Sequence, residues 1–255
     1  MKKRPKILVT NDDGIFAPGI RALVDVMKEI GDVLVVAPDR PQSGMGHAIT
    51  VSDLLRLRKV DFNEGVEAYS CSGTPVDCVK LAIYQVLKGK PDLLVSGINH
   101  GPNNSINVLY SGTMSAAVEG ALESIPSIGF SLMDHSLDAD MSESKPIVRR
   151  VAESALDNGI PEGSCLNVNI PAVRATEMKG IRICRQAKAF WEDDFEARTD
   201  PFGSEYYWLR GEFKNYDKGE DTDVWALDHN YVSVVPIQYD MTAHHDIVTL
   251  NNWDI

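Results

Sequence analysis

Short apolar runs alternate with longer amphipathic segments along the first two-thirds of the chain. The runs at residues 7–9, 32–37 and 92–96 are rich in Val, Ile and Leu, which is typical of strands buried on both faces of a sheet. Apolar residues recur at helical spacing over residues 20–27, between the first two runs. Strands that alternate with helices in this way predict an α/β fold with a doubly wound, mostly parallel sheet.

The same pattern predicts the remaining elements of this part of the chain. Further strands are expected at residues 47–51, 54–60, 66–70, 125–132 and 165–170, and helices at residues 74–87, 114–123 and 145–158.

From about residue 181 the pattern changes. Aromatic residues crowd together with Gly and acidic residues, which favours β-hairpins over further strand–helix units, and a late strand is expected at residues 232–237. We therefore expect a single domain with an α/β core over residues 1–180 and a hairpin-rich extension over residues 181–255. Because long aromatic hairpins outside a core commonly pack on another subunit, the extension is expected to serve in oligomerisation.

Composition narrows the class of protein. The chain has 255 residues, 44% of them hydrophobic and 24% charged, as in ordinary globular proteins. Its net charge of -12 argues against binding to a nucleic acid duplex, although a bound cation would still permit a phosphorylated substrate. Its four Cys form no C-x-x-C pair, and no apolar stretch is long enough for a signal segment or a membrane span. We expect a cytoplasmic protein with reduced thiols and no membrane partner.

The most informative stretch is the tetrapeptide NDDG at residues 11–14, directly after the first expected strand. Ligands of open α/β sheets bind outside the carboxyl ends of the strands, which is where Asp12 and Asp13 fall. Two adjacent carboxylates repel each other unless a proton or a cation intervenes, so the pair suggests a divalent metal. The alternative is an ordinary turn with a helix N-cap, and the tetrapeptide alone does not decide between them.

Two later loops supply further oxygen donors. Ser43 follows the second strand, and Asn99 follows the strand at residues 92–96. Together with Asp12 and Asp13, these residues suit one Mg, Mn or Ca ion and do not suit a thiolate zinc site.

A candidate phosphate site follows in the chain. Ser111, Gly112 and Thr113 precede a helix rich in Ala, and the free N–H groups at a helix N-terminus attract phosphate. The alternative interpretation is an N-cap on a helix of small residues that packs closely on the sheet.

Several ordered motifs closely resemble the SurE survival-protein nucleotidases. They are NDDG followed by PGI, then VVAPDRPQSG, SGTPVDCV, SGIN-x-GPN, YSGT-x-x-A-A-x-E-G and, late in the chain, YVSVVPIQYDMTAH. The resemblance implies a Rossmann-like core and a metal-dependent phosphatase that removes phosphate from nucleoside 5′- and 3′-monophosphates, and in some members from short polyphosphate. It also implies homodimers or homotetramers formed by exchange of C-terminal segments.

The resemblance further implies roles for individual residues. Asp12, Asp13, Ser43 and Asn99 correspond to metal ligands, with Asp12 also in the catalytic set. His244 corresponds to the acid that protonates the leaving alkoxide. The phosphate-pocket residues by this resemblance are Asn11, Asn103, Ser111, Gly112 and Thr113. The roles of His47, His100 and His245 stay open, as does the choice between direct attack by water and a phosphoenzyme.

Two other classes also place ligands at the edge of a parallel sheet. A phospho-receiver module has an acidic pair after its first strand, but it also needs a phosphate-accepting Asp where this chain has Ser43 and Asn99, and it is about half as long. A nucleotide-binding oxidoreductase would need a G-x-G-x-x-G motif after the first strand, and this chain has none there.

Overall fold

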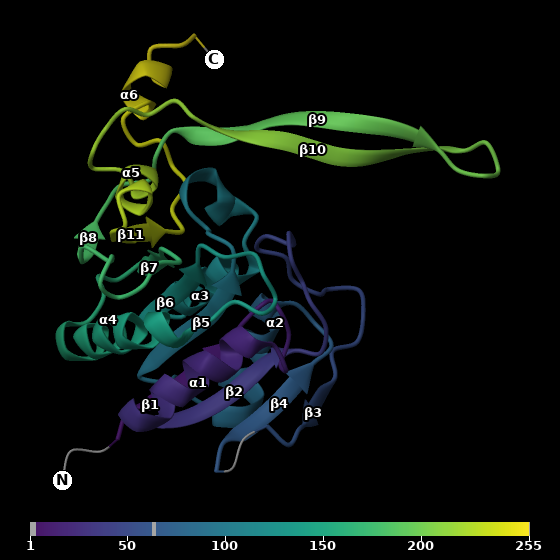
Figure 1. Ribbon diagram of the computed structural model, residues 1–255. Helices are drawn as coiled ribbons and strands as arrows, with labels where there is room; N and C mark the ends of the chain where they lie inside the picture. The colour runs from purple at the N-terminus through teal and green to yellow at the C-terminus, as the bar shows by residue number, and fades with distance from the viewer. Residues whose placement is uncertain (1–3, 63–64, 255) are drawn as a thin grey trace.

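The computed structural model describes residues 4–62 and 65–254, and it centres on a nine-stranded sheet in the order β3-β4-β2-β1-β5-β6-β7-β11-β8 (Figure 1). Neighbouring strands from β4 to β7 run parallel, as expected of a doubly wound sheet. The strands of this sheet are β1 (Lys6–Thr10), β2 (Asp32–Pro38), β3 (Leu57–Lys59), β4 (Glu67–Cys71), β5 (Leu93–His100), β6 (Ser127–Leu132), β7 (Ser164–Ile170), β8 (Ile181–Ile183) and β11 (Val232–Gln238). The predicted α/β fold class is therefore confirmed.

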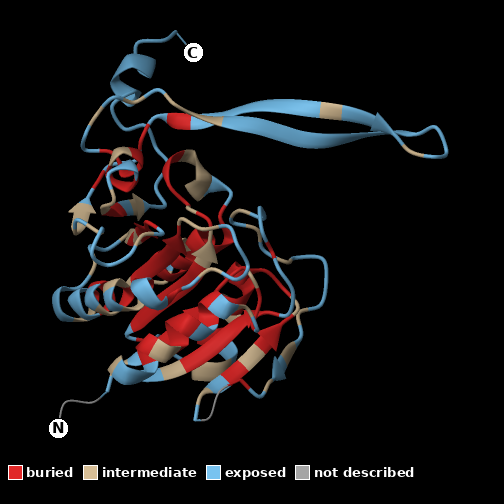
Figure 2. Cartoon of the chain, viewed as in Figure 1, coloured by how far each residue is buried: buried red, intermediate tan, exposed pale blue. Residues whose placement is uncertain are grey.

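Helices cover both faces of the sheet. The α-helices of the chain are α1 (Pro18–Ile30), α2 (Pro75–Leu81), α3 (Gly112–Leu122), α4 (Lys145–Asn158), α5 (Asp223–Asp228) and α6 (Ile247–Leu250). The last of them, α6, is exposed near the C-terminus and does not cover the sheet (Figure 1). Side chains of α1 and α4 share one apolar core with Ile7 and Val9, whereas α2 and α3 pack against Leu8 on the opposite face. Strand β1 thus alternates between two cores and is buried on both faces (Figure 2). The charged loop that follows it therefore starts from the interior.

Three predicted elements differ from the observed ones. Residues 47–51 form no strand, because side chains elsewhere bind this segment: Thr50 Oγ1 donates to Asp77 Oδ2 at 2.6 Å, and Thr74 Oγ1 donates to the Ala48 carbonyl at 2.7 Å. The strand expected at residues 54–60 shortens to β3. The helix expected at residues 74–87 is α-helical only to Leu81 and continues as a π-helix over Ala82–Leu87.

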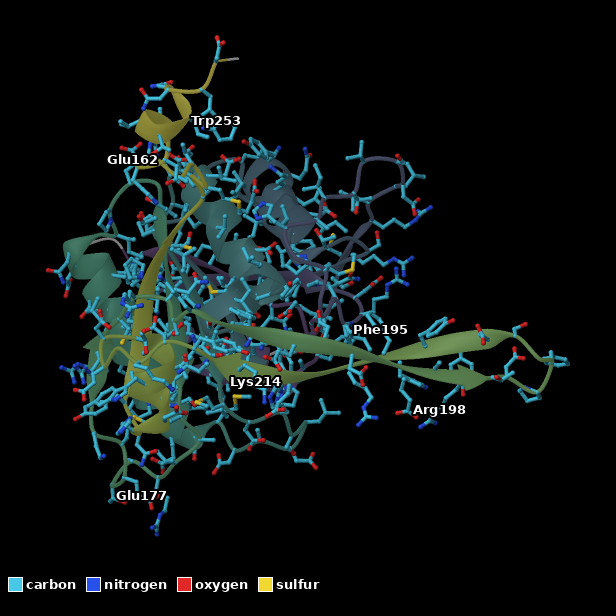
Figure 3. The ribbon with its side chains drawn as sticks, turned by 90° about the horizontal axis from the view of Figure 1, so that it is seen from above. Glu162, Glu177, Phe195, Arg198, Lys214 and Trp253 are labelled. Atoms are coloured by element: carbon cyan, nitrogen blue, oxygen red, sulfur yellow. The ribbon has the colours of Figure 1, made fainter. Side chains whose placement is uncertain are left out.

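The C-terminal region contains the expected hairpin. Strands β9 (Ala189–Thr199) and β10 (Glu205–Asn215) form a separate antiparallel sheet that projects from the body (Figures 1 and 3). Strand β11 returns to the main sheet, where it pairs antiparallel with β7 and parallel with β8, so this sheet continues past residue 180. Within the described residues, no helix is both long enough and apolar enough to cross a lipid bilayer.

Helix α1 approaches β5 so closely that only Gly fits at position 19. A Cβ atom there would lie 2.0 Å from the Ile98 carbonyl oxygen, which belongs to the backbone and cannot rotate away. We expect Gly19→Ala to lower the free energy of unfolding by about 1–3 kcal/mol, because overpacking outweighs a helix-propensity gain of at most about 1 kcal/mol. Urea unfolding measures this change.

Gly89 provides the matched control. The nearest atom to a Cβ placed there is the Leu87 carbonyl oxygen at 4.0 Å, so Gly89→Ala should leave stability within about 0.5 kcal/mol. Equal stability of the two variants would contradict the close approach of α1 to β5.

Candidate active site

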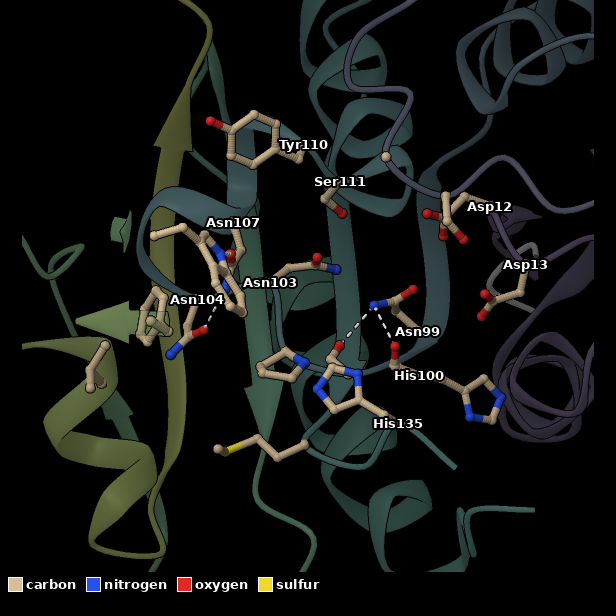
Figure 4. A pocket seen from close by; sticks show the side chains of 18 of the residues that line it. Asp12, Asp13, Asn99, His100, Asn103, Asn104, Asn107, Tyr110, Ser111 and His135 are labelled. Atoms are coloured by element: carbon tan, nitrogen blue, oxygen red, sulfur yellow. Dashed lines mark hydrogen bonds between the residues drawn. The ribbon is translucent and has the colours of Figure 1, made fainter. Parts of the chain in front are cut away.

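The order of the strands creates a crevice between β1 and β5. From β1 the chain winds outward through β2 and β4 on one side, then returns to place β5, β6 and β7 on the other side. The winding reverses between β1 and β5, where ligands of doubly wound sheets bind. A cavity of about 600 Å³ lies at the carboxyl ends of these strands (Figure 4). It is lined by six of the residues expected in a site, namely Asp12, Asp13, Ser43, Asn99, Asn103 and Ser111.

Asp12 is held deep in this cavity. Its side chain is buried, and its Oδ1 accepts a hydrogen bond from the Thr113 hydroxyl. A Cβ atom on Gly112 would lie 2.6 Å from the Asp12 Cβ, so the missing side chain lets α3 begin directly against the carboxylate. Burial raises the pKa of Asp12 to about 6, and the charge of Asp13 adds to this rise, although the Thr113 bond opposes it.

Asp13 is the adjacent carboxylate and is partly buried. Its Oδ2 atom is buried and has no hydrogen-bond partner among the described residues. Burial raises the pKa of Asp13, and the neighbouring His100 limits this rise. A buried carboxylate oxygen without a donor is costly unless a cation or a proton reaches it.

Asn99 is oriented by a bulge in β5. The register between β5 and β6 shifts between Ser96 and Asn99, which redirects the side chain toward the crevice. The Asn99 Nδ2 group donates to the carbonyls of His100 at 3.2 Å and Gly101 at 2.7 Å. Figure 4 shows that its Oδ1 consequently points toward the two carboxylates. The amide thus presents an oxygen acceptor to the acidic pair.

Ser43 lies on the exposed loop after β2 and lines the same cavity. The backbone N–H of Gln42, its neighbour, donates to the Asp12 carbonyl at 2.7 Å, and the Gly46 N–H donates to the Tyr110 carbonyl at 3.3 Å. These bonds hold the Ser43 loop against both sides of the crevice.

The five expected phosphate-pocket residues separate into two groups. Ser111 and Asn103 line the cavity, and Ser111 is also the N-cap of α3, since its hydroxyl accepts from the Met114 N–H at 3.0 Å. Asn11, Gly112 and Thr113 are buried behind the cavity wall, where the Asn11 amide donates to the Gly14 carbonyl at 2.9 Å. The N-cap interpretation of Ser111 is therefore confirmed, and its role in binding phosphate stays a prediction.

A buried polar network beneath Asn103 was not anticipated from the sequence. The Asn103 N–H donates to Asn169 Oδ1 at 2.7 Å, and its Nδ2 donates to the Ser131 hydroxyl at 2.8 Å. Asn167 Nδ2 donates to the Asn103 carbonyl at 2.7 Å. The network fixes both the backbone and the side chain of Asn103. Its only signal in the sequence is the pair of Asn residues two positions apart in an otherwise apolar strand.

The four histidines considered in the sequence analysis, out of six in the chain, lie in different surroundings. His100 lines the cavity and its Nδ1 lies 2.8 Å from the Ser136 carbonyl. His47 Nε2 lies 3.0 Å from the buried carboxylate of Glu119. His244 Nε2 lies 2.9 Å from Asp240 Oδ2 on an exposed segment, and His244 is not among the residues that line the cavity of its own chain. His245 is exposed beside Asp246.

The donor set of the crevice fits a hard divalent cation. It offers the unpartnered Asp13 Oδ2, the oriented Asn99 Oδ1, the Asp12 carboxylate and the Ser43 hydroxyl. Among the described residues, no three His, Cys, Asp or Glu side chains form a metal cluster, so a soft-metal site is not found there. A cation bound here could in turn bind a phosphate near the N-terminus of α3.

The raised pKa of Asp12 predicts how the stability of the fold depends on pH. Because the folded-state pKa of about 6 exceeds the ordinary 3.8, the native protein holds the proton more tightly, and stability in EDTA should fall as pH rises from about 4 to above 6. Asp12→Asn removes this ionisation and should be more stable than the wild type at pH 8 in EDTA, by up to about 3 kcal/mol. Urea unfolding of both proteins at about pH 4 and at pH 8 measures the difference.

The exposed carboxylate Glu162 is the control for this comparison, and Glu162→Gln should stay within about 0.5 kcal/mol of the wild type at both pH values. If Asp12→Asn were less stable than the wild type at pH 8, the burial of charge at Asp12 would be refuted.

Known proteins resemble this chain over nearly its whole length. The family model described as "Survival protein SurE" matches residues 7–193. A protein of Flavobacterium psychrophilum (strain ATCC 49511 / DSM 21280 / CIP 103535 / JIP02/86), named 5′-nucleotidase SurE, is 62% identical over 253 residues, which are 99% of this chain and 98% of that protein. A protein of Christiangramia forsetii with the same name is 60% identical and covers 100% of this chain and 98% of its own length. The crystal structure of the SurE protein from Aquifex aeolicus superposes with a TM-score of 0.85 at 41% identity, over 97% of this chain and 98% of that one. The chain therefore belongs to the SurE family.

Proposed function

We propose that the chain is a divalent-metal-dependent phosphatase that hydrolyses nucleoside 5′-monophosphates to nucleoside and phosphate, with nucleoside 3′-monophosphates and short-chain polyphosphate as additional substrates. One observation carries this proposal: a single cavity is lined both by the adjacent carboxylates of Asp12 and Asp13 and by the residue that caps α3. The names of the related proteins, 5′-nucleotidase SurE, support the same activity.

One divalent ion, Mg or Mn, would be held by Asp12, Asp13, Ser43 and Asn99. The fit rests on the buried Asp13 Oδ2, which has no hydrogen-bond partner within residues 4–62 and 65–254, and on the Asn99 amide, whose nitrogen already donates to two carbonyls. When bound, such an ion supplies Lewis-acid chemistry that lowers the pKa of water and offsets negative charge on the phosphoryl group.

The chain's own residues then bind and orient the phosphate. We assign this role to the Ser111 hydroxyl, the free N–H groups of Gly112 and Thr113 at the start of α3, and the amide of Asn103. Asn103 Nδ2 has two N–H groups and gives one to Ser131, which leaves the second for a phosphate oxygen. Thr113 acts through Asp12, whose carboxylate it holds by its hydroxyl. Asn11 supports the same loop through Gly14.

The leaving nucleoside alkoxide needs a proton, and we assign this role to His244. Its ring is held by Asp240, whose pKa is lowered to about 2, chiefly by bonds from Thr242, so that this carboxylate stays charged. Since His244 does not line the cavity of its own chain, the proposal includes a homodimer or homotetramer in which the C-terminal segment of one copy approaches the cavity of another. Exposed apolar residues on the hairpin, such as Phe202 and Leu209, support assembly. The buried, unpaired Cys residues support a cytoplasmic location.

Metal dependence is tested by phosphate release from a panel of nucleotides. EDTA should abolish release, and Mn or Mg should restore it. Asp12→Asn and Asp13→Asn should each lower kcat/KM more than about 100-fold, because loss of a ligand exceeds the effect typical of residues that only support ligands. Circular dichroism spectra unchanged from the wild type provide the folding control. Full activity of either variant, or full activity in EDTA, would refute the ligand assignment.

The role of His244 is tested by the choice of leaving group. We expect His244→Gln to lower kcat for a nucleoside monophosphate by about 10²–10⁴-fold, and to change kcat for p-nitrophenyl phosphate far less, because p-nitrophenolate leaves without a proton. His245→Gln, the adjacent imidazole, is the matched control and should retain activity on both substrates. Equal losses on both substrates in His244→Gln would contradict proton donation by His244.

A further inference from the structure

The cavity at the carboxylate pair extends to a second end that the proposed phosphate chemistry does not use. Figure 4 shows Asn107 and Tyr110 at this end, across the cavity from Asp12 and Asp13. Trp191, which is bonded to Asn107, and Phe213, which packs on Trp191, line the cavity from the base of the hairpin, and Met133 and Val224 are further lining residues. These side chains are largely apolar and aromatic, in contrast to the carboxylates and amides at the first end. A substrate that occupies the whole cavity therefore needs a charged end and an apolar, flat end.

The aromatic rings at this end are held in place. Trp191 Nε1 donates to Asn107 Oδ1 at 2.8 Å, and the Trp191 ring packs against Phe213, its partner across the hairpin, with ring centroids 5.6 Å apart. The Trp191 residue is nevertheless 44% exposed. An aromatic surface that is fixed yet open to a cavity can accept a planar ligand with little loss of side-chain entropy.

The base of the hairpin is also bound to the loop that carries Asn103. The Ser105 N–H donates to Asp223 Oδ2 at 2.7 Å, and the Ser105 hydroxyl donates to the carbonyls of Ala187 at 2.8 Å or Ala189 at 2.7 Å. The Ala187 N–H donates to Asp223 Oδ1 at 2.9 Å. Ser105 is buried and holds a positive φ of 50°, which these bonds stabilise. The two ends of the cavity are thus joined through one buried cluster.

Polar groups lie beside the aromatic end. Asn215, two residues beyond Phe213 on β10, and Asp228 also line the cavity, and an amide and a carboxylate can accept hydrogen bonds from ring N–H and amino groups. Burial raises the pKa of Asp228, and His229 limits this rise. The cavity volume of about 600 Å³ lies within the range of about 300–1,000 Å³ typical of small-molecule sites.

We propose that the aromatic end is a nucleobase subsite, in which the base of a nucleoside monophosphate stacks on Trp191 while the phosphate lies at the carboxylate end. The inference rests on the proposed function and adds to it the residues that recognise the base. Stacking on an aromatic ring tolerates every base, so the subsite selects nucleotides over phosphomonoesters that lack a base.

The test compares substrates with and without a base. In Trp191→Leu, KM for AMP should rise about tenfold with kcat nearly unchanged, which is the effect of one lost stacking contact made in the ground state. The kcat/KM for ribose 5-phosphate should stay within about twofold of the wild type, because this substrate has no base. Trp191→Phe retains a ring and should recover most of the affinity for AMP.

Phe195→Leu is the matched control. Phe195 lies on the same strand, on the part of the hairpin that projects from the body (Figure 3), and is 61% exposed but does not line the cavity. It should leave KM for AMP unchanged. An unchanged KM for AMP in Trp191→Leu, or equal losses on AMP and ribose 5-phosphate, would overturn the subsite.

Binding of the two product halves separates this proposal from the proposed function. Calorimetric titration should show adenosine binding weakened about tenfold by Trp191→Leu, whereas binding of inorganic phosphate should stay the same. If the wild type hydrolysed no phosphomonoester, the proposed function would fail, yet this titration would still decide the subsite: adenosine bound equally by the wild type and Trp191→Leu, or by neither, would overturn it.

Discussion

The repulsion and burial of two adjacent carboxylates is the constraint on which the site depends. Asp12 and Asp13 leave the central strand of the sheet at the point where its winding reverses, so they start from the interior and not from a solvated loop. Removal from water disfavours their charged forms, and each charge disfavours the other. A proton or a cation relieves this cost. Since a proton is lost near neutral pH, the fold holds the pair in the state in which a divalent ion would bind best.

The surroundings of the pair limit its movement and do not neutralise it. Thr113 binds Asp12, Gln42 binds the Asp12 backbone, and the Asn99 amide nitrogen is bound by carbonyls, but none of these residues brings a positive charge. Asn169 on β7 and Ser131 on β6 limit the movement of Asn103 in the same way. Each such bond contributes about 1 kcal/mol net, whereas a buried group left without its partner costs about 1–3 kcal/mol. The main effect of the network is therefore to fix one geometry of the site, and its contribution to the stability of the fold is smaller.

The sequence predicts those parts of the site that local rules determine. An apolar run that ends in NDDG, and a small-residue helix that begins after Ser111, can be recognised because strand ends and helix N-termini have local signatures. The partner of Thr113 lies 101 residues away and that of Ser105 lies 118 residues away, and no local pattern encodes either pairing. The same reason explains residues 47–51, where a short strand was expected although distant side chains bind the segment. The hairpin was expected from its composition, but its contact with the cavity was not.

The junction of the hairpin with the body fixes the position of the aromatic end of the cavity relative to its carboxylate end. The Asp223 carboxylate accepts hydrogen bonds from the N–H groups of Ser105, Ala187 and Val224. These bonds offset part of the cost of burying its charge. The carboxylate thereby joins the Asn103 loop to the start of β9. The buried cluster fixes the aromatic end of the cavity relative to the carboxylate end. With the proposed base subsite, stacking at Trp191 would add the same binding energy in the ground state and in the transition state, which lowers KM and leaves kcat nearly unchanged. The base of the hairpin is accordingly the part that is partly covered, with Ala189 buried and Phe213 half-buried, whereas the outer parts of both strands are exposed.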